Sequence, residues 1–188
     1  MAMRIPWIRR SALQRVEEKI VAGATMRDYE EVAQFTLKPD DLEQLLKTQT
    51  ECTFIWRMRD GSPIGIVMSY VWRDGKAWMT ASSQRPRVAA VRRDDRVSVV
   101  VSSAGTELPP RTATIRGRCK LYEDGETKRW FYPELAKALI PGNEQRQARF
   151  IKMLDSPRRV VMCVVPEKFI TFDSQKMGNY WRGGAEPE

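Results

Sequence analysis

Two Asp-Gly turns constrain the fold of this chain more than any other feature. Asp60-Gly61 and Asp74-Gly75 each lie between runs rich in β-branched and aromatic residues, and Asp-Gly is a preferred sequence for a tight β-hairpin turn. The runs that flank these turns, and that we predict as strands, are residues 53–58, 64–72 and 77–81. The sequence therefore predicts three consecutive antiparallel strands near the centre of the chain.

The second of these strands is apolar on both faces. Because side chains alternate along a strand, Ile64, Ile66 and Met68 share one face while Val67 and Val71 share the other. Apolar character on both faces is typical of a strand that is covered on both sides. We therefore expect this strand to be buried on both faces.

The third predicted strand leads into hydroxyl groups, arginines and a short helix. Thr80, Ser82 and Arg85 precede Pro86, and proline is favoured in the first turn of a helix. Free backbone N–H groups and the helix dipole attract a phosphate to such a terminus, and Arg87 adds a further charge-assisted donor. An alternative is a structural role, which is the more common outcome for this motif alone: a serine caps a surface helix and the arginines face solvent. The residues of this alternative are Ser82 or Ser83 as the cap, and Arg85, Arg87, Arg92 and Arg93 as the solvated face.

The order of the elements around this stretch matches a known family. The matching segments are, in order, the strand at 53–58, Asp60-Gly61-Ser62-Pro63, the strand at 64–72, Trp72-Arg73-Asp74-Gly75, Trp78-Met79-Thr80, Arg87, residues 91–101, and residues 112–121 with a Gly-containing kink at Gly117. Through this order, residues 52–122 resemble the FMN-binding split-barrel family of the pyridoxamine 5′-phosphate oxidase type, which includes deazaflavin-using relatives. The resemblance implies an α+β fold built on an antiparallel split β-barrel of six to seven strands.

The resemblance also implies a cofactor site. The flavin phosphate would lie on Thr80, Ser82, Arg85 and Arg87, and Arg87 stands where many relatives have a lysine. The backbone of residues 66–69 would lie along the isoalloxazine ring. The full set of implied cofactor-binding positions is Ile66, Val67, Met68, Ser69, Met79, Thr80, Ser82, Arg85, Arg87 and Trp181.

Members of this family are homodimers with the two cofactor sites at the subunit interface. Residues 100–103 of a second subunit and its C-terminal Trp181 could then complete each site, because the enzyme that names the family uses a tryptophan and an arginine near its C-terminus. Here Trp181 and Arg182 are flanked by Gly178, Gly183 and Gly184, so a flexible tail is an equally good interpretation.

The chain contains no histidine, which narrows the range of reactions and cofactors that it could use. Histidine is the commonest general base and metal ligand and the usual proximal haem ligand, so relatives that bind haem through histidine are disfavoured, as is the true biosynthetic oxidase. A flavin-dependent reaction is compatible with a chain that has no histidine, because the cofactor itself carries out hydride transfer. We expect an FMN-dependent oxidoreductase acting on a small organic substrate, with no catalytic residue assigned and with water or a tyrosine such as Tyr70 as a proton source. The alternatives are a reductase using the deazaflavin coenzyme and a non-catalytic flavin- or nucleic-acid-binding protein.

The net charge of +8 is the basis of the nucleic-acid alternative. Its candidate residues are Arg85, Arg87, Arg92, Arg93 and Arg96. Acidic residues interrupt this run, and the sequence contains no known helix-turn-helix or aromatic RNA-recognition motif, so nucleic acid is the less favoured partner. An anionic coenzyme tail would be attracted by the same charge.

The remaining sequence predicts a cytoplasmic protein with helices around the barrel. Residues 1–20 lack a continuous apolar core, and the three cysteines, Cys52, Cys119 and Cys163, lie in apolar runs typical of buried reduced thiols. The expected organisation is an N-terminal helical extension (1–50), a split-barrel flavin-binding domain (51–176) and a C-terminal tail (177–188). Predicted helices are residues 13–21, 40–47, 86–94, 124–139 with a kink or break at Pro133, and 143–154; a loop at 103–110 and a final pair of strands at 158–165 and 169–173 complete the prediction.

Overall fold

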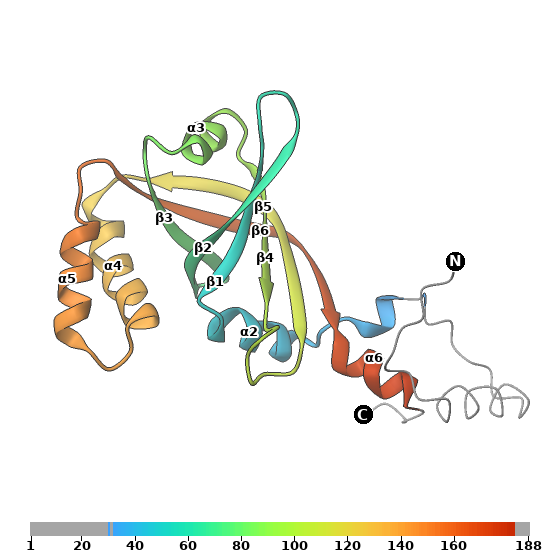
Figure 1. The fold of residues 1–188 in the computed structure, drawn as a ribbon. Helices are drawn as coiled ribbons and strands as arrows, with labels where there is room; N and C mark the ends of the chain where they lie inside the picture. The colour runs from blue at the N-terminus through green and yellow to red at the C-terminus, as the bar shows by residue number, and fades with distance from the viewer. Residues whose placement is uncertain (1–29, 31, 183–188) are drawn as a thin grey trace, which may run out of the picture. The chain divides into compact units, whose positions relative to one another are not determined.

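Six antiparallel strands close into a barrel in the computed structural model, which describes residue 30 and residues 32–182 (Figure 1). The strands are β1 (Glu51–Arg57), β2 (Pro63–Arg73), β3 (Lys76–Ser82), β4 (Arg96–Ser102), β5 (Arg111–Tyr122) and β6 (Arg159–Asp173). Their order around the barrel is β1-β2-β3-β6-β5-β4. The chain divides into two units, Met1–Gln34 and Phe35–Glu188, and the barrel belongs to the second. The predicted α+β antiparallel barrel is confirmed.

Helical segments precede, interrupt and follow the strands in the described part of the chain. They are η1 (Val32–Phe35), α2 (Pro39–Thr48), α3 (Pro86–Arg93), α4 (Gly125–Leu139), α5 (Glu144–Leu154) and α6 (Ser174–Trp181). Figure 1 shows α3 at the upper end of the barrel, α2 at the lower end, and α4 and α5 side by side as a pair. The predicted helix at 13–21 lies outside the described residues. In the described part of the chain, no helix is long and apolar enough to cross a membrane.

The two Asp-Gly turns form as predicted. Asp74 and Gly75 have φ values of 51° and 67°, and the flanking Arg73 and Lys76 are paired, which is the left-handed two-residue turn that suits a hairpin. The turn before β2 is longer, with the Met58 N–H donating to the Ser62 carbonyl at 2.8 Å. Both hairpins of the predicted three-stranded unit are therefore confirmed.

One prediction about the later elements is wrong, and one of the two alternatives given for Pro133 is excluded. Residues 158–173 were expected to form a pair of strands, but β6 is one strand that pairs with β5 along its length, apart from a register shift between Arg116 and Gly117 opposite Pro166. A proline is tolerated at such a bulge because the ladder hydrogen bond is already interrupted there. In α4, Pro133 lies inside one continuous helix rather than between two short ones.

The prediction that β2 is buried on both faces is also wrong for half of the strand. Met68, Tyr70 and Val71 are buried, but Ile64 is 40 % exposed and Val67 is 66 % exposed. The second half of β2 pairs with β3 and its outer face packs with α4, whereas Val67 lies on an outer face that no element of the single described chain covers.

The barrel interior is filled by inward side chains from all six strands, with Phe54, Met79 and Ile115 among the fully buried ones. A second apolar cluster joins the outer faces of β2, β3 and β6 to α4 and α5. The cysteines are free and buried, as predicted, and burial raises the pKa of Cys52 to about 12. The Cys163 pKa is raised to about 11 for the same reason, so both thiols stay protonated near neutral pH.

Tyr70 is a structural residue rather than a proton source. Its side chain is fully buried inside the barrel, and its hydroxyl donates to the Leu46 carbonyl at 2.8 Å. We expect Tyr70→Phe to destabilise the protein by about 1–3 kcal/mol, because the buried carbonyl of Leu46 loses its donor. Urea unfolding measures the change, with Tyr122→Phe on the barrel exterior as the control. Equal stability of the Tyr70→Phe protein and the wild type would contradict this role.

Candidate functional site

The candidate site begins where β2 and β3 separate. Register pairs between these strands run from Tyr70–Met79 to Arg73–Lys76, whereas residues 63–69 of β2 pair with β1. At the other side of the gap, Thr80–Ser82 pairs with β6. Among the described residues, the β3-facing edge of residues 66–69 therefore has no strand partner, and its backbone N–H and C=O groups remain available to a ligand.

Alternation on β2 and β3 sorts the predicted ligand-binding positions into two groups. Met68 and Met79 point into the barrel core, so these positions can reach a ligand in the gap only through their backbone. Thr80 and Ser82 lie on the outer face and are half-buried. The Thr80 hydroxyl donates its single hydrogen to the Val160 carbonyl at 2.8 Å, which leaves both lone pairs as acceptors and no donor for a phosphate oxygen while that bond is kept.

Helix α3 presents its N-terminus beside Ser82. The helix begins at Pro86, as predicted, and Val88 and Val91 form the buried stripe that anchors it. Arg85 is the N-cap residue and makes no side-chain capping bond, so the alternative in which Ser82 or Ser83 caps this helix is wrong. The cap supplies no side-chain acceptor; Pro86 has no N–H, and the Val88 N–H donates to the Arg85 carbonyl at 2.9 Å, so the Arg87 N–H is the group of the first turn that stays open to a ligand.

Three arginines meet at this helix terminus. Arg85 and Arg87 come from the start of α3, and Arg159, which pairs with Ser82 in the sheet, comes from the start of β6. The pKa of Arg87 is lowered, first by burial and then by repulsion from Arg85 and Arg159. The Nε atoms of both Arg87 and Arg159 are buried without a hydrogen-bond partner in the described structure. We call Arg85, Arg87 and Arg159 the arginine cluster.

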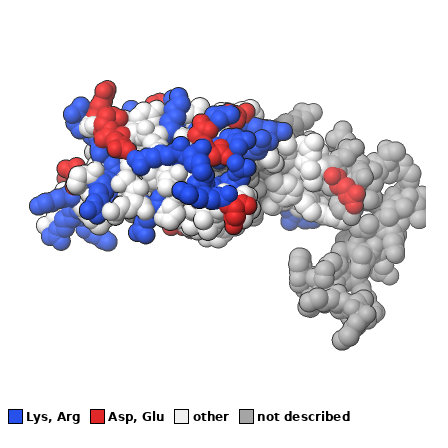
Figure 2. All heavy atoms as spheres, turned by 90° about the horizontal axis from the view of Figure 1, so that it is seen from above, with Lys and Arg blue, Asp and Glu red and all other residues white. Residues whose placement is uncertain are grey.

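Other arginines near α3 are paired differently. Arg92 forms a 2.7 Å ion pair with Glu123, and Arg96 forms a 2.8 Å ion pair with Asp94. Figure 2, which looks down on the end of the barrel where α3 lies, shows Lys and Arg side chains spread across this face with acidic side chains in a few patches. The arginine cluster differs from this general surface because the Nε atoms of Arg87 and Arg159 are buried without a partner.

Tyr132 of α4 lies against the same cluster. The aromatic run at 130–132 is used for packing, with Phe131 and Tyr132 both buried, yet the Tyr132 hydroxyl is also buried without a partner. Burial raises its pKa to about 12, Arg159 acts in the opposite direction and Asp155 raises it further. Sequence reasoning missed Arg159 and Tyr132, since the pairing of β3 with β6 brings Arg159 beside Ser82 and the packing of α4 brings Tyr132 near Arg159.

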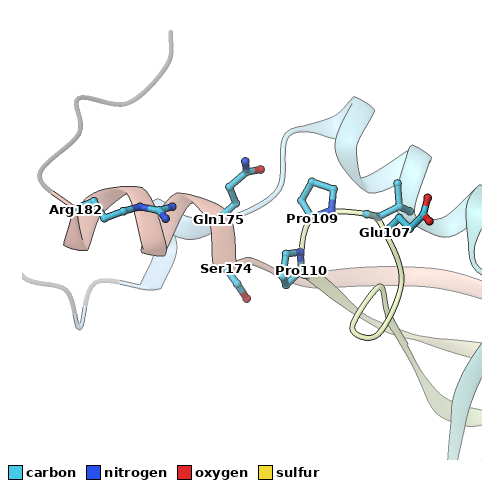
Figure 3. Close-up of a pocket in the computed structure, with 7 residues that line it drawn as sticks. Glu107, Pro109, Pro110, Ser174, Gln175 and Arg182 are labelled. Atoms are coloured by element: carbon cyan, nitrogen blue, oxygen red, sulfur yellow. The ribbon is translucent and has the colours of Figure 1, made fainter. Parts of the chain in front are cut away.

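Trp181 does not join this site within one chain. It lies on α6, 47 % exposed, beyond the far end of β6 from Arg159. A strand of 15 residues spans roughly 45 Å, so only a second subunit could bring this tryptophan to the arginine cluster. Its neighbour Arg182 lines a separate pocket of about 440 Å³ between α6 and the loop before β5 (Figure 3).

The closed barrel, the gap between β2 and β3 and the basic N-terminus of α3 are together the features of the split-barrel class of proteins. A family model described as pyridoxamine 5′-phosphate oxidase matches residues 39–172, and the chain belongs to this family. No curated protein matches the sequence.

Solved structures agree on the fold. A conserved hypothetical protein from Mycobacterium tuberculosis is 20% identical with a TM-score of 0.68, and the match covers 78% of this chain and 91% of that chain. An FAD-binding protein from Mesorhizobium loti is 17% identical with a TM-score of 0.56, covering 72% and 94%. An F420 reductase is 20% identical with a TM-score of 0.54, covering 68% and 94%.

Proposed function

We propose that this protein binds FMN and is a flavin-dependent oxidoreductase for a small organic substrate. The observation that carries the proposal is Arg87: a guanidinium whose Nε atom is buried without a partner, beside Arg85 and at the start of α3. Burying an unpaired charge among like charges is costly, and a bound phosphate removes that cost. Ser82 and the backbone N–H of Arg87 add neutral donors to the same point, whereas Pro86 has no N–H and the Val88 N–H donates to the Arg85 carbonyl at 2.9 Å.

The isoalloxazine ring would lie in the gap between β2 and β3. The free backbone edge of residues 66–69 supplies donors and acceptors for the polar rim of a flavin ring, and the exposed Val67 side chain supplies an apolar surface for its face. The phosphate end and the ring end of the cofactor thus both meet groups that lack partners in the single chain.

Bound FMN supplies the hydride chemistry. The protein residues bind the phosphate, orient the ring and hold the substrate against it, and none of them is required to take part in bond making. The chain has no histidine, and Tyr70 is buried away from the gap, so a proton needed at the substrate would come from water.

A second subunit would complete the site. The outer faces of five strands carry an uncharged row in register, formed by Val67, Thr53, Val100, Thr114 and Ile170. Val67 and Ile170 in this row are 66 % and 53 % exposed, which is costly for a monomer and suits a homodimer interface. Such a dimer would place residues 100–103 and α6 of one subunit near the gap of the other.

Titration of the apo protein with FMN, and separately with the deazaflavin coenzyme, tests the proposal. We expect fluorescence to report FMN binding with a dissociation constant in the micromolar range or below, about −8 kcal/mol or stronger. Tighter binding of the deazaflavin coenzyme would replace FMN with that coenzyme and keep the fold and the site. Failure to bind either coenzyme would contradict a flavin-dependent function.

A further inference from the structure

The arginine cluster extends beyond the residues that the proposed phosphate site needs. Arg159 lies beside that site on β6 and Tyr132 on α4, so residues from three elements, α3, β6 and α4, are brought together only by the fold. We propose that Arg159 and Tyr132 complete a binding site for a terminal phosphomonoester in its dianionic form. This inference rests on the proposed function and specifies the anion that the site selects.

The first argument is charge. A phosphomonoester carries close to two negative charges at neutral pH, whereas a phosphodiester carries one. The three guanidinium groups have no described acidic partner in a salt bridge, and the pKa of Arg87 is lowered partly by the other two. A dianion balances most of this charge, while a diester would leave two positive charges facing one another in a half-buried site.

The second argument is the number of donors. A terminal phosphate has three unesterified oxygens, and a diester has two. The Nε–H groups of Arg87 and Arg159 and the hydroxyl of Tyr132 come from three elements and are each buried without a partner, and Arg159 interacts electrostatically with both Arg87 and Tyr132. The raised pKa of Tyr132 keeps its hydroxyl neutral near pH 7, so it can donate.

The third argument is the contrast between adjacent residues. Arg158 is exposed, whereas Arg159 is half-buried and paired in the sheet with Ser82. Alternation along the start of β6 therefore directs only one of two consecutive arginines to the site. This pair provides a matched control, because either substitution removes one positive charge from the same segment.

The experiment compares FMN with riboflavin, which has the same ring and no phosphate. We expect Arg159→Gln to weaken FMN binding by about 10- to 100-fold, the range for loss of a charge-assisted hydrogen bond, and to leave riboflavin binding unchanged. Tyr132→Phe should weaken FMN binding by about 10-fold or more, because a hydrogen bond to the phosphate dianion is charge-assisted. Arg158→Gln should bind both ligands as the wild type does.

Several results would overturn the inference. Equal weakening of FMN and riboflavin by Arg159→Gln would show a structural role, and an unchanged FMN affinity would show that Arg159 does not touch the phosphate. Tighter binding of FAD than of FMN would refute selection of a terminal monoester.

Inorganic phosphate separates this inference from the proposed function. If the site selects phosphate, millimolar phosphate should raise the melting temperature of the wild type and of Arg158→Gln but not that of Arg159→Gln. A wild type that binds neither FMN nor riboflavin yet shows this pattern would refute the flavin proposal and keep the phosphate site. A melting temperature that phosphate leaves unchanged in all three proteins would refute the phosphate site.

Discussion

Replacing both Arg85 and Arg87 with alanine is expected to weaken FMN binding by at least about 100-fold. Each guanidinium would contribute a charge-assisted hydrogen bond to the phosphate, worth about 1.5–3 kcal/mol, and the two substitutions also remove charge that attracts the dianion. Fluorescence titration of the single and double variants measures the loss. Riboflavin binding should stay within about 2-fold of the wild type, because riboflavin has no phosphate to lose.

The same substitutions should not destabilise the protein without cofactor. Arg87 is partly buried beside two like charges, so its removal relieves repulsion, and the free energy of unfolding should stay equal or rise. Arg92→Ala is the matched control, because this exposed arginine is on the same helix and is already paired with Glu123. Unchanged FMN affinity in the double variant would remove the phosphate-site assignment and leave the fold intact.

Local features were predictable from the sequence. The Asp60-Gly61 and Asp74-Gly75 turns and the start of α3 at Pro86 depend on residues that are neighbours in the chain. The kink at Gly117 is another such feature: a Cβ atom there would lie 2.2 Å from the Val165 carbonyl oxygen, so only glycine fits the bulge opposite Pro166.

Long-range features were not predictable from one sequence. The pairing of Ser82 with Arg159 joins segments that lie far apart in the chain, and no local pattern specifies that register. The exposure of Val67 depends on which elements cover its face, which alternation alone does not reveal. For that reason the sequence predicts Ser82, Arg85 and Arg87 as a candidate phosphate site, while Arg159 and Tyr132 required the fold.

The proposed homodimer leads to the second large effect. We expect Val67→Asp to convert the dimer into a monomer and to abolish FMN binding at micromolar concentrations, both because the second subunit is lost and because a carboxylate replaces the apolar side chain proposed to meet the flavin ring. In a two-fold interface each substitution occurs twice, so two carboxylates would be buried among uncharged neighbours such as Thr53 and Val100. Light scattering after size-exclusion chromatography measures the mass of the assembly, and flavin fluorescence measures binding.

The folded monomer should survive this substitution. Val67 is 66 % exposed in the single chain, so an aspartate there meets water, and the melting temperature should fall only through loss of the dimer. Met153→Asp is the control, because Met153 is similarly exposed at 61 % but lies on α5, away from the row on the sheet. A wild-type monomer, or a Val67→Asp protein that remains dimeric, would contradict this interface. A Val67→Asp monomer that binds FMN as tightly as the wild type would show instead that one chain holds the whole cofactor site, because the gap between β2 and β3 would then need no second subunit.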